Sequence, residues 1–310
     1  MSSARVSPYL LLVLTNLFWA GNFVVGRAVH GLIPPAGTTF WRWVIALAVL
    51  TPLAAGAVRR DWPLVRRHWP RLALMGVLSV CAFSTLLYTG LADTTATNAL
   101  LLNSTAPVLI VIAGWLVGGE RVTTVQAAGI ATSFAGVTAI VFRGSWEGIR
   151  ALEFGAGDVW VLAAVTVWAG YTVLLRWRPT AIVPVVFLAV TITAGVFASL
   201  PLYVWEVMSG APTIPTLGSV SGLLYMGVLP SLVSHAFWNR AVGEVGGNTA
   251  GLFIHLTPVF GTLLAVTFLG ETFHLYHAVG IALILAGIVV TTRSATSRLP
   301  TRHHEHSSPD

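Results

Sequence analysis

Polar and aromatic side chains recur at helical spacing inside long apolar segments of this sequence, and they are the residues best suited to bind a polar ligand. Thr15, Trp19 and Asn22 are four and three residues apart, so a helix would place them on one face. A second stripe contains Ser231, Ser234, His235, Trp238 and Asn239. A polar group in hydrocarbon is costly unless it faces protein or a cavity. The stripes therefore predict a polar interior space between several helices.

Other apolar segments contribute residues of the same kind. Asn98 and Thr105 are seven residues apart, as are Asn248 and His255. The candidate lining residues are Trp19, Asn22, Tyr88, Asn98, Trp168, Tyr171, His235, Trp238, Asn239 and His255. The alternative for the polar groups is hydrogen bonding that holds helices together. For the tryptophans it is an interfacial belt, which suits Trp62 and Trp69 better than Trp19 and Trp168.

The composition indicates that these segments lie in a membrane. Hydrophobic residues make up 55% of the 310 residues and charged residues 9%, whereas soluble domains have about 25% charged residues. So few charged groups cannot cover a soluble fold, but lipid requires no such cover. All 17 basic residues are arginines, mostly in short connections, which fits membrane topology better than nucleic-acid binding. A soluble enzyme and a nucleic-acid partner are therefore excluded.

Ten apolar segments are long enough to cross a bilayer as helices, which need about 20 residues each. They cover residues 9–29, 35–57, 70–91, 95–117, 122–142, 157–177, 181–207, 217–240, 247–269 and 274–292. Membrane β-barrel strands instead show about ten alternating residues, a pattern absent here. The sequence predicts an all-α integral protein of the cell membrane with ten transmembrane helices and a disordered tail over residues 294–310.

Arginines are distributed unevenly between the two sets of alternate connections. With a cytoplasmic N-terminus, thirteen arginines fall on the cytoplasmic side and two, Arg143 and Arg150, on the other. Cytoplasmic loops of membrane proteins carry an excess of basic residues. We therefore expect both termini to be cytoplasmic.

The two halves of the chain resemble each other. WAGNFVVGR at 19–27 returns as WAGYTVLLR at 168–176, and GIATSFAGV at 129–137 returns as GIALILAGI at 280–288. The stretches 107–120 and 258–271 both begin with Pro-Val and end with Gly-Glu, so the offset is 149 to 151 residues throughout. Three matches in one order predict two homologous five-helix repeats, residues 1–145 and 155–293. Because five is odd, the second repeat must be inverted in the membrane, an architecture typical of transporters.

These features together resemble the drug/metabolite transporter superfamily, in particular its EamA-like members. The resemblance is carried by the Trp-Ala-Gly-Asn segment of the first helix, Arg42 in the second, the Pro-Val to Gly-Glu stretches, and the five-plus-five layout. It covers nearly the whole chain and implies a ten-helix exporter of amino acids or related small metabolites. Substrate identity varies among such relatives, so the resemblance does not imply a particular solute.

Five further residues are expected to have gating or structural roles. An arginine at the centre of a membrane helix costs about 2.5 to 3.5 kcal/mol, so Arg42 should face a cavity, pair with carbonyl groups or extend toward the membrane surface. Pro107 and Pro258 interrupt equivalent helices, either as hinges or as static kinks. Glu120 and Glu271 each follow a glycine that ends a helix, which is an ordinary capping arrangement, with gating as the alternative.

Secondary or facilitative transport is the function that these features favour. The sequence contains no GxxxxGK[ST] loop for a nucleotide, no cofactor motif and no metal motif such as HExxH. A membrane-embedded enzyme acting on a lipid-soluble substrate is the alternative, but the eleven acidic residues are scattered. If protons are exchanged, His235 and His255 are the central groups that titrate near neutral pH, and neutral hydrogen-bonded histidines are the alternative. The expected partners are a small-molecule substrate and the bilayer, with a homodimer as one option for assembly.

The lining residues also predict the chemistry of the solute. Trp19 and Trp168 are repeat equivalents, and inverted halves would place them on opposite walls of one space. Indole faces attract an ammonium group or stack on an aromatic side chain. Asn22 and Asn239 could bind a carboxylate. This combination suits a zwitterionic amino acid with an aromatic or bulky apolar side chain.

Overall fold

The computed structural model describes residues 6–29, 31–119, 122–145, 147, 150, 154–269 and 272–296. All regular elements in these ranges are helices, and no strand occurs among them. Nine helical stretches of the described residues are long and apolar enough to cross a membrane. The prediction of an all-helical membrane protein is therefore confirmed. From residue 297 onwards the predicted tail lies outside the described residues.

The helices of the first half follow the predicted segments. They are α1 (Pro8–Val29), α2 (Pro35–Arg60), α3 (Trp62–Gly76), η1 (Val77–Ala82), α4 (Phe83–Asp93), α5 (Ala96–Asn103), α6 (Ala106–Gly118) and α7 (Thr124–Val141). α3, the π-helical turn η1 and α4 form one continuous stretch, which begins eight residues before the predicted segment 70–91. α2 and α3 are separated by a single residue, Asp61. Pro63 is the second residue of α3, where its missing N–H has little cost.

The second half has a corresponding series. Its helices are α9 (Ala156–Leu174), η2 (Leu175–Trp177), α10 (Pro184–Met208), α11 (Leu217–Met226), η3 (Gly227–Val233), α12 (Ser234–Val245), α13 (Gly247–Leu252), η4 (Phe253–His255), α14 (Leu256–Leu269) and α15 (Leu275–Thr296). η3 is a second π-helical turn. The predicted segment 247–269 consists of three consecutive short helices, α13, η4 and α14, rather than one regular helix.

Helix ends carry recognisable sequence signals. The Thr123 hydroxyl accepts the N–H of Gln126 at 3.2 Å, and Gln126 Oε1 accepts the N–H of Thr123 at 3.1 Å. This reciprocal capping box starts α7. α6 ends at Gly119, whose φ of +63° is a conformation that glycine adopts without strain. The glycine of this Gly-Glu pair is thus a helix cap, while Glu120 and Glu271 lie outside the described residues.

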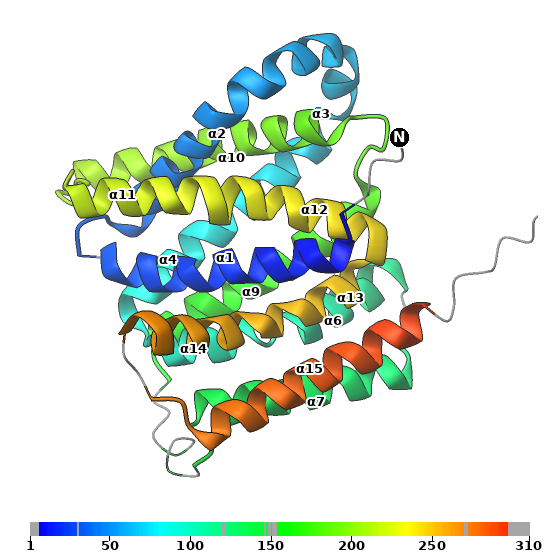
Figure 1. Ribbon diagram of the computed structural model, residues 1–310. Helices are drawn as coiled ribbons and strands as arrows, with labels where there is room; N and C mark the ends of the chain where they lie inside the picture. Colours follow the sequence, from blue (N-terminus) through cyan, green and yellow to red (C-terminus); the bar gives the residue numbers. More distant parts are fainter. Residues whose placement is uncertain are drawn as a thin grey trace, which may run out of the picture.

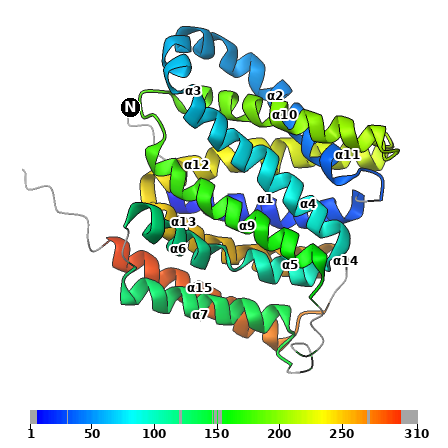
Figure 2. The same ribbon diagram turned by 180° about the vertical axis from the view of Figure 1, so that it is seen from behind.

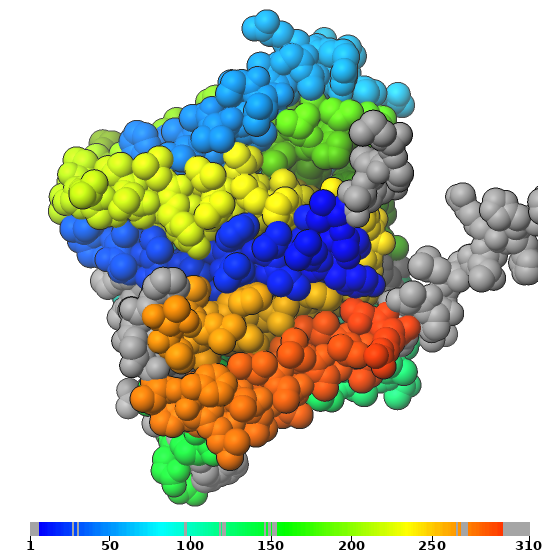
Figure 3. Space-filling model, viewed as in Figure 1, coloured from blue at the N-terminus to red at the C-terminus, as the bar shows by residue number. Residues whose placement is uncertain are grey.

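The helices lie side by side in a bundle (Figures 1 and 2). α7 and α15 pack together at one edge, and α2, α3 and α10 lie at the opposite edge. On the face shown in Figure 3, α1 lies between α11–α12 on one side and α13–α14 on the other. α1, α9 and α12 lie between these two edges, and one side of each helix is buried in the interior of the bundle.

Glycines allow α7 and α15 to approach closely. A Cβ atom at Gly136 would lie 2.5 Å from the carbonyl oxygen of Gly280, and one at Gly287 would lie 2.4 Å from that of Gly129. Small residues permit such backbone contact between membrane helices. The repeated segments 129–137 and 280–288 therefore pack against each other.

The chain ends and the connections divide between two ends of the bundle. The start of α1 and the end of α15 lie at the same end as the α2–α3 connection, which we name the terminal end (Figure 1). The α1–α2 and α10–α11 connections lie at the other end, which we name the distal end. There the N–H of Ile214 donates to the carbonyl of Leu32 at 2.9 Å, so the two connections are hydrogen-bonded.

Large apolar side chains cover the outside of the bundle. Leu53 of α2, Phe197 of α10 and Leu217 of α11 are 72%, 69% and 88% exposed. Water would disfavour such a surface, whereas lipid tails accept it. The exposed residues therefore support the membrane assignment independently of helix length.

Candidate functional site

Three tryptophans from three helices meet at the centre of the bundle. Trp19 of α1 contacts Trp168 of α9 edge to face, with ring centroids 5.1 Å apart. Trp238 of α12 lies 5.3 Å from Trp19 and 5.5 Å from Trp168. Tyr171 lies 5.3 Å from Trp168 on the same helix. The structure thus brings the repeat-equivalent residues Trp19 and Trp168 into direct contact.

Arg42 of α2 is buried and held by three neutral side chains. Its Nε donates to the Ser231 hydroxyl at 2.6 Å, and its Nη1 donates to Oδ1 of Asn22 at 3.1 Å. Nη1 also donates to the Tyr88 hydroxyl, which itself donates to Oδ1 of Asn22 at 2.9 Å. Of the three placements expected for Arg42, the structure therefore has the one that faces the interior.

The Arg42 guanidinium has no acidic partner in the described part of the chain. No aspartate or glutamate there lies within 4 Å of it. The rings of Trp43 and Tyr88 lie 5.5 and 5.4 Å from its Cζ, distances at which a cation is attracted to an aromatic face. The centre of the molecule therefore carries a buried positive charge that only dipoles and rings offset.

One narrow central cavity lies among these groups, and some of them line it. Its lining consists of Trp19, Asn22, Phe23, Arg42, Trp43, Phe83, Ser84, Leu87, Asn103, Trp168, Pro230, His235 and Ile254. The free volume is about 30 Å³, enough for roughly two water molecules. A free amino acid needs more space, so the cavity is contracted in this conformation.

His235 forms part of the cavity wall, and among the described residues neither ring nitrogen makes a hydrogen bond of normal geometry, although backbone groups of Ser79, Pro230 and Ser231 lie near the ring. Its imidazole is 3% exposed and packs edge to face on Trp43 at 4.7 Å and on Trp168 at 5.4 Å. The indole nitrogen of Trp238 is also unpartnered. Buried polar groups are nearly always hydrogen-bonded. Of the two side chains only His235 lines the central cavity, so its imidazole is the one placed to bind water or a ligand there.

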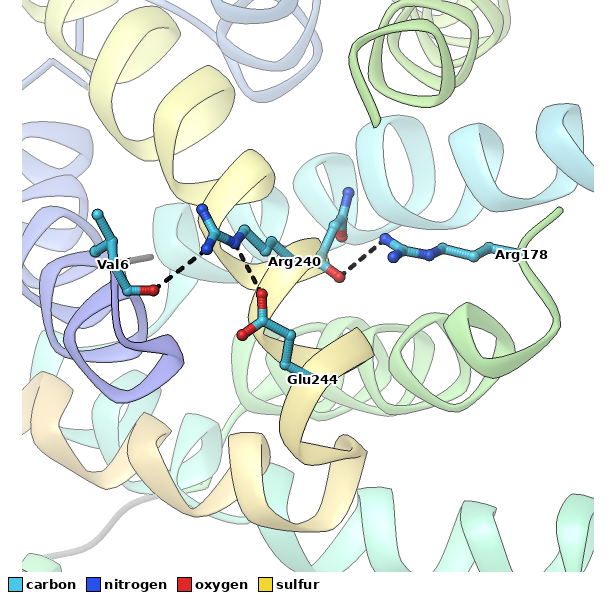
Figure 4. Close-up of polar contacts among 5 residues, drawn as sticks. Val6, Arg178, Arg240 and Glu244 are labelled. Atoms are coloured by element: carbon cyan, nitrogen blue, oxygen red, sulfur yellow. Dashed lines mark hydrogen bonds and ion pairs between the residues drawn. The ribbon is translucent and has the colours of Figure 1, made fainter. Parts of the chain in front are cut away.

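A second tyrosine–asparagine pair lies next to the tryptophans. The Tyr171 hydroxyl donates to Oδ1 of Asn239 at 2.6 Å. The backbone carbonyl of Asn239 accepts Nη1 of Arg178 at 3.2 Å (Figure 4). Asn239 thus connects the aromatic cluster, through Tyr171, to an arginine that lies outside the central cavity.

Arg178 lines a second, larger cavity. This cavity has a volume of about 330 Å³ and is lined by Ile110, Thr172, Val173, Leu175, Arg176, Arg178, Thr180, Val242, Gly243, Gly246, Gly247 and Asn248. Nearby on α12, Arg240 pairs with Glu244 at 2.9 Å and donates to the Val6 carbonyl at 3.3 Å (Figure 4). The contact with Val6 places this region at the terminal end.

Asn98 lies outside the central cavity. Its Nδ2 donates to Oδ2 of Asp158 at 3.3 Å, and the Thr94 hydroxyl donates to the other carboxylate oxygen. Oδ2 of Asp158 also accepts the N–H of Gly155 at 2.8 Å. Asn98 therefore holds the start of α9 against α5, the helix-joining role that was the alternative to cavity lining.

His255 and the two prolines lie where helices are interrupted. His255 Nε2 donates to the carbonyl of Ser104 at 2.8 Å, between α5 and α6. Pro107 is the second residue of α6, and Pro258 is the third residue of α14. Both prolines thus lie in the first turn of a helix that follows an interruption, and their role as hinges or static kinks stays a prediction. His255 is fully buried there and does not line the central cavity.

The sequence patterns do not predict some residues that line the central cavity, among them Trp43, Ser84 and Pro230. Nε1 of Trp43 donates to the Ser84 hydroxyl at 3.0 Å, and Nε1 of Trp19 donates to the Pro230 carbonyl at 3.1 Å. Helical spacing could have found Ser84, which lies four residues before Tyr88 and shares its face. Trp43 has no such signal, because a tryptophan in a membrane helix is ordinarily explained by packing or by the interface.

The chain is similar to known transporters over nearly its whole length. The model of the EamA-like transporter family matches residues 6–142 and 155–293. An uncharacterized transporter of Archaeoglobus fulgidus is 31% identical over 299 residues, covering 92% of this chain and 96% of that protein. A probable terminal-alkyne amino-acid exporter of Streptantibioticus cattleyicolor is 30% identical, covering 93% of this chain and 94% of the exporter.

A solved structure has the same fold. It is described only as a crystal structure of a protein and is 20% identical in sequence, with a TM-score of 0.75. The match covers 95% of this chain and 99% of that one. At this identity the similarity shows the fold alone.

Proposed function

The chain belongs to the EamA-like transporter family, and we propose that it exports amino acids or related small metabolites across the cytoplasmic membrane by alternating access. The relative named as a probable terminal-alkyne amino-acid exporter supports an amino acid as the solute. Transport is secondary or facilitative, because the sequence has no nucleotide-binding loop of the GxxxxGK[ST] kind.

Residues 1–145 and 155–293 form two inverted five-helix repeats in this proposal, giving ten transmembrane helices. Inverted halves are related by a pseudo-two-fold axis, and residues close to that axis contact their own equivalents. Three contacts support this arrangement: Trp19 with Trp168, Ser104 with His255 through its carbonyl, and Ser133 with the carbonyl of Ile284 at 3.4 Å. The partners in each contact are separated by 149 or 151 positions, which is the offset of the sequence repeat.

The two tyrosine–asparagine pairs add support for inverted repeats. At the repeat offset, Asn22 corresponds to Tyr171 and Tyr88 corresponds to Asn239. Each pair therefore joins equivalent helices, with the tyrosine and the asparagine exchanged between the two halves. The π-helical turns η1 and η3 also begin at equivalent residues, Val77 and Gly227.

The contact between Trp19 and Trp168 is the observation that carries alternating access. Each repeat contributes one of these rings to the central cavity. Movement of one half against the other would separate the rings toward one side of the membrane and then toward the other. The contracted cavity corresponds to the closed stage between these two states.

The orientation follows from the arginine distribution. Thirteen arginines predict that the terminal end lies in the cytoplasm. The 330 Å³ cavity beside Arg178 then faces the cytoplasm, where a solute to be exported would enter. The distal end is the exit, beyond Arg42 and the hydrogen-bonded connections at Leu32 and Ile214.

Transport by the purified protein in vesicles tests this proposal. We expect vesicles that contain the protein to equilibrate labelled L-phenylalanine or L-leucine faster than empty vesicles, and the solute to be recovered unchanged. A chemically altered solute would instead support a membrane-embedded enzyme. If the vesicles neither move nor alter any amino acid or related metabolite that is supplied, the proposal is rejected.

A pair of tryptophan variants tests the position of the site. Trp19→Phe removes the indole donor to Pro230 and part of an edge-to-face contact, together worth about 1.4 kcal/mol, so flux should fall roughly tenfold. Trp160 lies on the same helix as Trp168 but is 44% exposed on the outside, so Trp160→Phe should leave flux within about twofold. Equal flux in Trp19→Phe and Trp160→Phe would place the site elsewhere.

A further inference from the structure

We propose that the central cavity selects solutes that carry a carboxylate, with Arg42 binding the carboxylate and His235 accepting a hydrogen bond from the amino group. The solute class is then α-amino acids with apolar or aromatic side chains, and amines without a carboxylate are excluded. This inference rests on the proposed export of small metabolites and names the chemistry by which the cavity chooses among them.

The bonding of Arg42 leaves part of the guanidinium for a ligand. Nε and Nη1 donate to Ser231, Asn22 and Tyr88, whereas Nη2 donates to no group in the described part of the chain. The cavity is lined by Arg42. A guanidinium presents five N–H donors in a planar fork that matches a carboxylate. The free Nη2 edge is therefore the natural position for a carboxylate oxygen.

The charge balance of the cavity favours the same ligand. The groups around Arg42 and the central cavity that come from α1, α4, η3, α9 and α12 are neutral. Three acidic residues of the described chain bind other groups. Glu206 binds the first turn of α2, Asp158 binds Thr94 and Asn98, and Glu244 pairs with Arg240. A buried charge without a counter-ion is costly. A bound carboxylate would supply the missing counter-charge, whereas a cationic amine would add a second positive charge.

His235 supplies the complementary group for the amino end. It is 3% exposed and lines the cavity, and among the described residues neither ring nitrogen makes a hydrogen bond of normal geometry, although backbone groups of Ser79, Pro230 and Ser231 lie near the ring. A neutral imidazole has one nitrogen that accepts a hydrogen bond. An amino group donates such bonds, so Arg42 and His235 together match the two ends of an α-amino acid.

The cavity walls would hold the side chain. Trp19 and Trp168 from opposite repeats, with Phe83 beside Trp168 at 4.9 Å, form an aromatic surface. Such rings stack on aromatic or apolar groups. Because the free volume is about 30 Å³, the rings must separate when the solute enters, which links binding to the movement of the two repeats.

The positive charge occurs in one repeat only. At the repeat offset, Arg42 corresponds to Thr191 of α10. The Thr191 hydroxyl donates to the carbonyl of Phe187 at 2.9 Å, within its own helix. The first tyrosine–asparagine pair therefore binds an arginine that lines the central cavity, whereas the arginine beside the second pair, Arg178, lies outside it. The central cavity thus has one carboxylate position rather than two.

Competition binding on the purified full-length protein tests the proposal. Labelled L-phenylalanine is the probe, and the competitors are 3-phenylpropanoate, which lacks the amino group, and 2-phenylethylamine, which lacks the carboxylate. We expect 3-phenylpropanoate to compete within about tenfold of L-phenylalanine. Loss of a charge-assisted bond weakens binding by about 10- to 100-fold, so we expect 2-phenylethylamine to be weaker by at least that factor. This series needs no variant and therefore does not depend on folding of a mutant.

Variants then test which residue binds the carboxylate of the solute and which binds its amino group. Arg42→Gln should weaken L-phenylalanine binding by roughly 10- to 100-fold and remove the preference over 2-phenylethylamine, whereas Arg42→Lys should retain the preference. His235→Leu should bring L-phenylalanine to the affinity of 3-phenylpropanoate. Thr191→Val, at the position equivalent to Arg42, is the matched control and should change neither affinity nor preference. Thermal unfolding and gel filtration of each variant show whether it is folded.

The outcomes separate this inference from the proposed function. Equal competition by the amine and the acid in the wild-type protein would overturn carboxylate selection and leave export in place. An Arg42→Gln protein that is folded and keeps the wild-type preference would overturn the role of Arg42. A wild-type protein that neither binds nor moves any amino acid would overturn the proposed function and this inference together.

Discussion

Glu206 connects the two halves of the chain at the distal end. It lies near the end of α10, and its two carboxylate oxygens accept the N–H groups of Ala36 and Gly37 at 2.9 and 2.7 Å. These residues form the first turn of α2, whose N-cap, Pro34, provides no side-chain hydrogen bond. Free N–H groups at a helix start require partners and attract negative charge. Glu206 therefore caps α2 from the other repeat and should keep the distal end closed.

The substitution Glu206→Gln should open that end. The glutamine oxygen can accept one of the two N–H groups, but its NH₂ group cannot accept the other, and the charge is lost. A hydrogen bond to a charged group is worth about 1.5 to 3 kcal/mol and the helix-dipole interaction about 0.3 to 1 kcal/mol. A net loss of about 2 kcal/mol would raise the open population roughly 30-fold.

Labelling of one engineered cysteine measures this population. Cys81 is the only native cysteine and is replaced by serine, and Ser84→Cys places a thiol in the lining of the central cavity. The rate of reaction with a membrane-impermeant maleimide, added to the outside of right-side-out vesicles, should rise roughly 30-fold in Glu206→Gln. Glu244→Gln removes an exposed pair worth about 0.3 to 0.5 kcal/mol and is the matched control. Equal labelling rates in Glu206→Gln and Glu244→Gln would refute the proposed role of Glu206 in keeping the distal end closed.

Three further predictions concern topology, coupling and packing. A reporter that is active only outside the cytoplasm should be silent when fused after Arg302 and active when inserted in the connection 143–156. The reverse pattern would overturn the proposed orientation, and equal activity at both positions would overturn the inverted repeats. His235→Gln combined with His255→Gln should leave the pH dependence of flux unchanged, because His255 donates to the Ser104 carbonyl and His235 packs on the rings of Trp43 and Trp168. Loss of the pH dependence in the double variant would instead reveal a proton relay. Gly287→Ala would place a Cβ atom 2.4 Å from a carbonyl oxygen of α7. It should therefore cost about 1 to 3 kcal/mol of stability, which a lowered thermal unfolding temperature in detergent would show.

The fold could be predicted because its signals are local. Segment length and composition alone indicate membrane helices, and the described residues contain nine such stretches. The repeat emerges only when distant segments are compared, but its offset of 149 residues predicts that Trp19 and Trp168 are equivalent residues that face one central space. What the pattern could not supply was the separation of the rings, which depends on how the two halves pack.

The partners of polar residues could not be predicted in the same way. Asn98 and Asn22 both interrupt apolar segments, yet one binds Asp158 and the other binds Arg42. Helical spacing gives the face on which a side chain lies but not the group that the neighbouring helix presents to it. Glu206 shows the same limit, since it binds α2 from about 170 positions away and lies near a helix end where acidic residues are common.

The two ends of the bundle differ chemically even though both halves of the chain match the same family model. At the repeat offset, Pro35 at the start of α2 corresponds to Pro184 at the start of α10, and Glu206 corresponds to Ala57. The start of α10 has no side-chain cap, and alanine cannot provide one. Closure of the distal end is thus supported by a carboxylate cap on α2, whereas the start of α10 at the terminal end has no side-chain cap. We infer that the empty protein opens more readily at the terminal end, which is cytoplasmic in the proposed orientation. This bias cannot set the direction of net flux, which the solute gradient determines. It does make the unoccupied Arg42 accessible from the cytoplasm, the side from which an exporter binds its solute.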